Sequence, residues 1–153
     1  MRNVIDKCLY HNNNAVLLVA DFGKFPSMET TDRYINVSLS ESLMVNVAIG
    51  LASTGKNVFI YSAAGFSLYR AFDTIKHNIV ENNFKGNITF LNPGEGFIYD
   101  FGLTHMLIDD LNILSDSFYN FNVHMPYDEK STALALSNAK GVTYIRLCPD
   151  NTQ

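Results

Sequence analysis

The chain has 153 residues, of which 47% are hydrophobic, and a formal net charge of −4 at pH 7. This length suits one domain with a buried core, and the scattered lysines and arginines argue against nucleic acid or an anionic membrane as a partner. No apolar run is long enough to span a bilayer. The first residues include Asp6 and lack the pattern of a signal peptide, so we expect a cytoplasmic protein.

The chain opens with a predicted helix over 3–12. The apolar run from 15 to 20 then has no polar interruption, which is typical of a strand buried on both faces. A loop rich in turn residues leads to a short predicted strand over 34–37. A predicted helix over 42–54 follows it and ends before Gly55, a good C-terminal cap.

Strands and helices continue to alternate in the second half of the chain. A long helix predicted over 65–81 lies between strands predicted at 57–61 and 87–91. The remaining predicted elements are a helix at 104–114, a strand at 122–125, a helix at 128–139 and a strand at 142–145. This alternation predicts a single three-layer α/β domain over residues 1–153, with a mainly parallel, doubly wound sheet of about six strands and helices on both faces.

The junction between strand 34–37 and the next helix carries a single acid, Glu41. Ser40 is a good N-cap residue, and an acid in the first turn of a helix is stabilised by the helix dipole, so Glu41 has an ordinary structural explanation. Open α/β folds also bind their ligands at the carboxyl edge of the sheet, where this junction is expected to lie. The residues alone leave both interpretations open.

Four short motifs follow one another along the chain: Val19-Ala20-Asp21, Ser38 to Met44, Arg70 to Ile75, and Gly102-Leu103-Thr104-His105. In this order and at these spacings they resemble the motifs of the pyrimidine-binding domain of the transketolase family of thiamine-diphosphate enzymes. The deoxyxylulose-phosphate synthase branch of that family shares most of them. The resemblance covers about residues 15–148.

The resemblance implies catalytic roles for Glu41 and His105. In this family a glutamate hydrogen-bonds the far ring nitrogen of the cofactor's aminopyrimidine and favours the tautomer that acts as a base, and Glu41 matches that glutamate. The role requires Glu41 to face a groove, poorly solvated and free of a salt bridge, so that it can share a proton with the ring. His105 matches a histidine at the reacting end of the substrate, with a purely structural histidine as the alternative.

Three further residues match positions around the cofactor, and a fourth is expected to lie beside them. Asp21 matches an acid near the thiazolium ring, although aspartate at a strand end is also an ordinary turn residue. Phe66 and Tyr69 match aromatic positions beside the pyrimidine. Tyr61 is expected to fill the space left by Ala63, where the family has a third aromatic. Ring stacking contributes roughly 0.5–1.5 kcal/mol beyond area burial, but core packing explains the same aromatic residues equally well.

Two positions depart from the family pattern at the substrate end of the site. Phe101 stands where the family has an acid that binds a sugar hydroxyl, and a phenyl ring cannot accept that hydrogen bond. Pro149 stands where an arginine often binds a sugar phosphate. A phosphorylated ketose is therefore in doubt as substrate. The pair Asp109-Asp110 is interpreted as a solvated or capping feature.

The sequence lacks the Gly-Asp-Gly segment and downstream asparagine with which this family holds the magnesium diphosphate, so we expect no metal site in the chain. Since sites in this family form between different chains, the resemblance implies a separate subunit that carries the diphosphate-binding domain and Mg²⁺, in a heterotetramer. The predicted function is that of the small subunit of a split transketolase-like enzyme, which transfers a two-carbon ketol unit from a sugar or keto-acid donor to an aldehyde. The alternatives are a subunit of a pyruvate-using carboligase similar to deoxyxylulose-phosphate synthase, and a non-catalytic assembly or regulatory domain.

Overall fold

The computed structural model describes residues 1–63, 65–93, 105 and 108–147. Strands and helices alternate along these segments, as the sequence predicts. The strands are β1 (Ala15–Val19), β2 (Tyr34–Asn36), β3 (Asn57–Tyr61), β4 (Asn87–Pro93), β5 (Asn122–His124) and β6 (Val142–Leu147). The helical segments are α1 (Arg2–Tyr10), η1 (Met28–Thr30), α2 (Glu41–Ser53), α3 (Phe66–Tyr69), α4 (Phe72–Thr74), η2 (Ile75–Glu81), α5 (Asp110–Asp116) and α6 (Glu129–Asn138).

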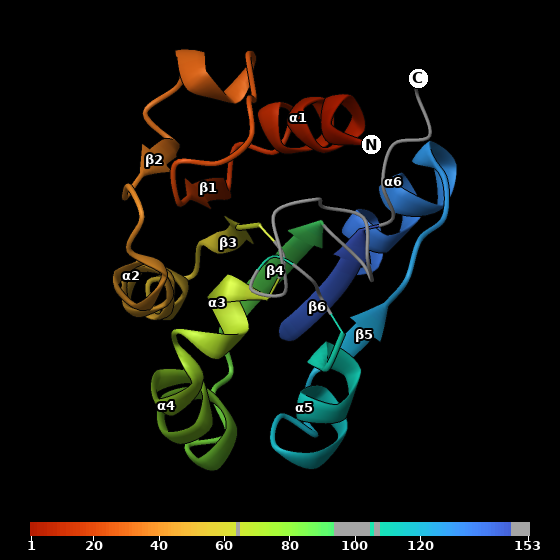
Figure 1. The fold of residues 1–153 in the computed structure, drawn as a ribbon. Helices are drawn as coiled ribbons and strands as arrows, with labels where there is room; N and C mark the ends of the chain where they lie inside the picture. The colour runs from red at the N-terminus through yellow and green to blue at the C-terminus, as the bar shows by residue number, and fades with distance from the viewer. Residues whose placement is uncertain (64, 94–104, 106–107, 148–153) are drawn as a thin grey trace.

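The six strands form one sheet in the order β2-β1-β3-β4-β6-β5, and all neighbouring strands are parallel (Figure 1). The chain runs from β1 outward to β2 and then returns to the other side of β1 to form β3. This reversal is a topological switch point, where α/β folds open a crevice at the carboxyl ends of the strands. The predicted doubly wound parallel sheet is confirmed.

Side chains of the strands alternate between two apolar cores, one on each face of the sheet. Leu18 belongs to the core beneath α2, the segment from α3 to η2, and α5. Leu17 belongs to the core beneath α1 and α6. Because both faces are covered, all five residues of β1 are buried, which explains its unbroken apolar sequence.

The predicted helix over 65–81 is wrong as one continuous helix, because three short segments replace it. Ala71 interrupts it, with a φ of −112° and a ψ of 17°, and η2 is a π-helix. The interruption frees the backbone carbonyl of Arg70, which accepts a hydrogen bond from the Ser42 hydroxyl of α2. Apolar spacing identified the buried face, including Leu68 and Ile75, but it carries no information on this contact between helices.

The interpretation of Asp110 as a solvated or capping residue is wrong. Its side chain is fully buried, accepts a hydrogen bond from the Tyr144 hydroxyl at 2.8 Å and lies 3.0 Å from the Arg146 Nε. Burial, and then the charge of Asp110, raise the pKa of Tyr144 well above its usual value, so the hydroxyl stays a donor. A buried carboxylate requires such partners, and here they fix the start of α5 against β6.

The surface of the domain has short sheet edges. Both edge strands, β2 and β5, have three residues, and short edges limit pairing with other chains.

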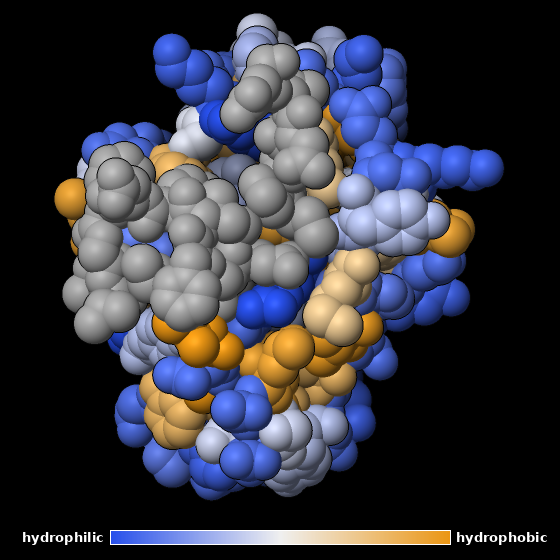
Figure 2. Space-filling view, turned by 45° about the vertical axis from the view of Figure 1, so that its right-hand side comes forward, coloured by the Kyte–Doolittle hydropathy of each residue, from blue (hydrophilic) through white to orange (hydrophobic). Residues whose placement is uncertain are grey.

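The side that carries α5, β5 and α6 comes forward in Figure 2, where apolar side chains lie among hydrophilic ones. Met125 and Leu134 are exposed there. Among the described residues, none of the helices has the length and apolar character needed to cross a membrane.

Replacing Tyr144 with phenylalanine removes one hydrogen bond from the buried Asp110 carboxylate. We expect the free energy of unfolding to fall by about 1–3 kcal/mol, because a buried charged acceptor loses a donor. Urea unfolding measures the change. Tyr119→Phe is the matched control, since Tyr119 is 70% exposed and its variant should unfold like the native chain. Equal stability of the two variants would contradict this account of α5.

Candidate functional site

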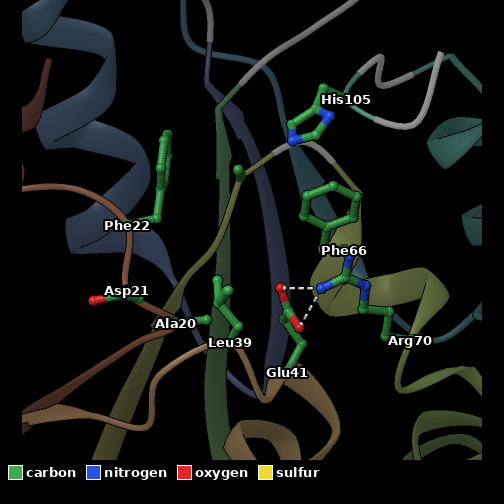
Figure 3. A pocket seen from close by; sticks show the side chains of 9 residues that line it. Ala20, Asp21, Phe22, Leu39, Glu41, Phe66, Arg70 and His105 are labelled. Atoms are coloured by element: carbon green, nitrogen blue, oxygen red, sulfur yellow. Dashed lines mark hydrogen bonds and ion pairs between the residues drawn. The ribbon is translucent and has the colours of Figure 1, made fainter. Parts of the chain in front are cut away.

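A cavity of about 430 Å³ opens at the switch point, at the carboxyl edge of the sheet (Figure 3). The loops after β1 and β3, the start of α2, the α3 region and residue 105 contribute its lining. The lining residues are Ala20, Asp21, Phe22, Leu39, Glu41, Ala63, Phe66, Arg70 and His105. Phe22 stands on one side and Phe66 on the other, with Leu39 and Glu41 between them. The cavity thus combines apolar walls with a small number of charged or titratable side chains.

Glu41 is the first residue of α2, directly after the loop that follows β2. Ser40 occupies the N-cap position, as predicted, but its side chain makes no capping hydrogen bond. The Glu41 side chain is only 3% exposed. Since a surface first-turn acid is normally solvated, this burial is not explained by helix capping alone. Glu41 faces the cavity, as its predicted role requires.

The expectation that Glu41 is free of a salt bridge is wrong. Arg70 Nη1 lies 3.0 Å from Glu41 Oε1 and 2.8 Å from Oε2. An ionised carboxylate at this depth requires a compensating charge. The pair does not fill the carboxylate, because one nitrogen contacts both oxygens and each oxygen accepts more than one hydrogen bond. Arg70 is also 48% exposed, so only one partner of the pair is buried.

Phe66 connects Arg70 to His105. The Arg70 guanidinium carbon lies 4.1 Å from the centroid of the Phe66 ring, within cation–π distance. The His105 ring packs edge-on against the same ring, with 5.1 Å between centroids. These contacts place an aromatic wall, a histidine and a guanidinium beside Glu41, although His105 is distant from it along the chain.

Asp21 lies at the rim of the cavity in a strained turn. Its φ is +51°, and its backbone N–H donates to Asn36 Oδ1 at 3.1 Å. Asn36 Oδ1 also accepts from the N–H of Ser38, which has a φ of +57°. Asn36 therefore connects the loops after β1 and β2, which both line the cavity. The Asp21 carboxylate accepts from Asn36 Nδ2 at 3.3 Å and points away from Glu41 (Figure 3).

The other predicted site residues lie elsewhere. Tyr61 is 2% exposed and belongs to the core on the α1 face, where Phe22 stacks on it with 5.7 Å between centroids. Burial raises the pKa of the Tyr69 hydroxyl. Neither tyrosine lines the cavity. The predictions for Phe101 and Pro149 fall outside the described residues.

The sequence reasoning missed Phe22, Leu39 and Arg70 as cavity residues. Phe22 lines the cavity whereas Tyr61 does not, because alternation along β3 directs Tyr61 to the opposite core. Leu39 is 73% exposed and lies two positions before Glu41. An exposed leucine beside a candidate acid is a signal that could have been used. Within the described residues there is no group of three or more His, Cys, Asp or Glu that could hold a metal ion.

Comparisons with known proteins agree with this architecture. The profile of the family "Transketolase, pyrimidine binding domain" matches residues 5–150. A subunit of the apulose-4-phosphate transketolase of Actinobacillus succinogenes is 31% identical over 122 residues, which cover 78% of this chain and 39% of that protein. Transketolase-like protein 2 of Mus musculus is 30% identical over 146 residues, covering 88% and 22% respectively. The chain thus spans less than half the length of these relatives.

Among solved structures, one described as "Split gene transketolase, inactive beta4 tetramer" superposes with a TM-score of 0.80 at 28% identity. The match covers 96% of this chain and 50% of the other. A transketolase of Campylobacter jejuni superposes with a TM-score of 0.77 at 18% identity, covering 95% and 25% respectively, which supports the fold. Because the family profile covers nearly the whole chain, this protein belongs to the transketolase pyrimidine-binding domain family.

Proposed function

We propose that the chain supplies the pyrimidine half of the active site in a split, thiamine-diphosphate-dependent transketolase-like enzyme. The observation that carries the proposal is Glu41, a carboxylate 3% exposed at the floor of an apolar cavity at the switch point. Helix capping does not require such burial, whereas binding one polar edge of a flat, mostly apolar ring does.

The residues present fit the aminopyrimidine part of the cofactor. Phe22 and Phe66 offer flat apolar walls on opposite sides of the cavity, and Glu41 offers one carboxylate between them (Figure 3). When bound, the cofactor would supply the nucleophilic carbon needed for ketol transfer, and Glu41, Phe22 and Phe66 would hold its aminopyrimidine ring. Glu41 holds a hydrogen bond to the ring nitrogen, and the walls exclude water from it, which strengthens that hydrogen bond.

His105 is proposed to act at the substrate end of the cavity. Its edge-on packing against Phe66 fixes the plane of the imidazole, so its nitrogens keep a defined direction. A positioned histidine can donate a hydrogen bond to an oxygen of the substrate and exchange a proton with it near neutral pH. Asp21 stabilises the turn after β1 through its hydrogen bonds with Asn36. We also propose that it lies near the thiazolium ring of the bound cofactor.

The diphosphate and Mg²⁺ are assigned to a separate subunit. The names of two similar proteins support this division, since one is described as a subunit of a transketolase and the other as the product of a split gene. The proposed assembly is a heterotetramer in which each site combines two chains. A sugar or keto acid is the donor and an aldehyde the acceptor, and parallel assays with a ketose and with pyruvate separate the transketolase-like enzyme from the pyruvate-using alternative.

One observation favours a non-catalytic assembly domain instead. Arg70 already contacts both oxygens of the Glu41 carboxylate, and such an ion pair also has a purely structural explanation. The half-exposure of Arg70 and the unused acceptor capacity of Glu41 argue for the catalytic proposal. The activity of variants in the complex decides between the two.

The purified chain is expected to bind thiamine diphosphate weakly and to show no transferase activity. Activity should appear when it is mixed with a partner chain that carries the Gly-Asp-Gly segment and downstream asparagine, because the diphosphate gains its ligands there. Coupled assays of ketol transfer, with each chain alone and with both together, measure this. Turnover by this chain alone would refute the division of the site.

Glu41→Gln should lower turnover of the reconstituted complex by roughly 10²–10⁴-fold, since an amide cannot exchange a proton with the ring nitrogen. Steady-state kinetics at saturating cofactor measure the loss. Glu81→Gln is a matched control, because Glu81 is 50% exposed and does not line the cavity. Unchanged turnover of the Glu41 variant would support the non-catalytic assembly domain.

His105→Ala should lower kcat/KM for the donor by about 10²-fold or more while leaving the Kd of thiamine diphosphate nearly unchanged. The reason is that His105 lies at the mouth of the proposed ring site and contacts substrate rather than the pyrimidine. Kinetics and calorimetry on the same complex separate the two constants, with His124→Ala on β5 as control. A parallel loss of cofactor affinity would place His105 in the ring site instead.

A further inference from the structure

Two helical regions meet at Arg70 in a way that the proposed function leaves unexplained. The Arg70 backbone carbonyl accepts a hydrogen bond from Ser42, and its guanidinium contacts both oxygens of Glu41, the residue next to Ser42. Its guanidinium also lies over Phe66. Arg70 is thus held at its backbone by α2 and at its side chain by an aromatic ring and a carboxylate. This is more than a surface ion pair requires.

The burial of the two partners is unequal. Glu41 is 3% exposed, whereas Arg70 is 48% exposed. Removing a guanidinium from a buried carboxylate leaves an uncompensated charge, which such a site relieves by taking up a proton. Among the described residues, Arg70 is thus positioned to compensate a negative charge on Glu41. Within the described part of the chain, the other titratable side chains that line this cavity are those of His105 and Asp21, and Asp21 points away from Glu41.

Arg70 approaches the carboxylate from the side of α3, across from Phe22 and Leu39 (Figure 3). One nitrogen spans both oxygens, so acceptor directions of the carboxylate remain for a second donor. A ring nitrogen and Arg70 can both contact Glu41. The hydrogen bond between Glu41 and a neutral ring nitrogen needs one proton, because neither an anionic carboxylate nor a ring nitrogen lone pair can donate.

We propose that Arg70 is a positioning residue that keeps Glu41 ionised and directed at the cavity in the empty subunit. Binding of an aminopyrimidine then brings one proton from solvent into the hydrogen bond between Glu41 and the ring nitrogen. The inference rests on the proposed function, because it takes the aminopyrimidine as the ligand. It goes further in assigning the charge state of Glu41 to Arg70, which acts through its contact with both carboxylate oxygens.

The test is calorimetric titration of the full chain with 4-amino-2-methylpyrimidine at pH 8, in two buffers of different ionisation enthalpy. The difference in apparent enthalpy gives the number of protons taken up for each ring bound. The native chain should take up about one proton, Arg70→Met close to none and Arg70→Lys about one. Arg2→Met removes an exposed charge outside the cavity and should match the native chain.

A second measurement requires no ligand. Arg70→Met should reduce the free energy of unfolding more at pH 8 than at pH 5, because its buried Glu41 must be protonated to remain in the folded chain and the unfolded chain releases that proton. Stability present at low pH is then lost as pH rises. In a Glu41→Gln background, Arg70→Met should lower the free energy of unfolding by the same amount at pH 8 and at pH 5. This comparison also removes any contribution of His105 from the result.

The outcomes separate the two proposals. Proton uptake by Arg70→Met equal to that of the native chain, with Glu41-dependent binding of the probe, overturns the Arg70 role and leaves the proposed function intact. Absence of probe binding at millimolar concentration overturns both. A pH-independent stability deficit in Arg70→Met also overturns the Arg70 role, and restoration of proton uptake by Arg70→Lys supports it.

Discussion

A single buried carboxylate constrains much of what surrounds it. Glu41 is 3% exposed, and Arg70 contacts both of its oxygens, so an ionised carboxylate at that depth has a compensating charge beside it. Arg70 is the C-cap residue of α3, next to the interruption at Ala71, and its backbone carbonyl accepts a hydrogen bond from Ser42, the neighbour of Glu41. The broken helix, the exposed arginine and the buried acid are therefore one arrangement rather than three unrelated features.

The topology explains why this arrangement lies at a cavity. The chain reverses direction between β1 and β3, so the loops after these strands diverge and leave a crevice at the carboxyl edge of the sheet. Asn36 connects the loop after β1 to that after β2 by accepting from the N–H groups of Asp21 and Ser38. Toward the other edge of the sheet, the buried contacts of Asp110 with Tyr144 fix the start of α5, which follows residue 105. Hydrogen bonds thus connect several of the described elements near the cavity.

The family assignment and the geometry of the cavity answer different questions about this protein. A fold supports many activities, so the profile match and the superposition establish the domain but not the reaction. The cavity adds specific chemistry, with flat apolar walls, one buried acid, one guanidinium and one histidine. These groups suit a ring with a single polar edge. They offer no cradle for a diphosphate within the described residues, which is the physical basis for placing the other half of the site on another chain.

The sequence by itself determined the alternation of strands and helices, the burial of β1 on both faces and the position of Glu41 at a strand-to-helix junction, because periodicity and order report local structure directly. It also grouped Glu41, Phe66 and His105, through motifs in a fixed order. Only the tertiary structure decided the sides on which aromatic residues lie, with Tyr61 in the opposite core and Phe22 at the cavity. It also decided the partners of two buried acids, Arg70 for Glu41 and Tyr144 for Asp110, which are 29 and 34 residues distant. Such pairs depend on how separate elements pack, and periodicity within one element carries no record of its neighbours.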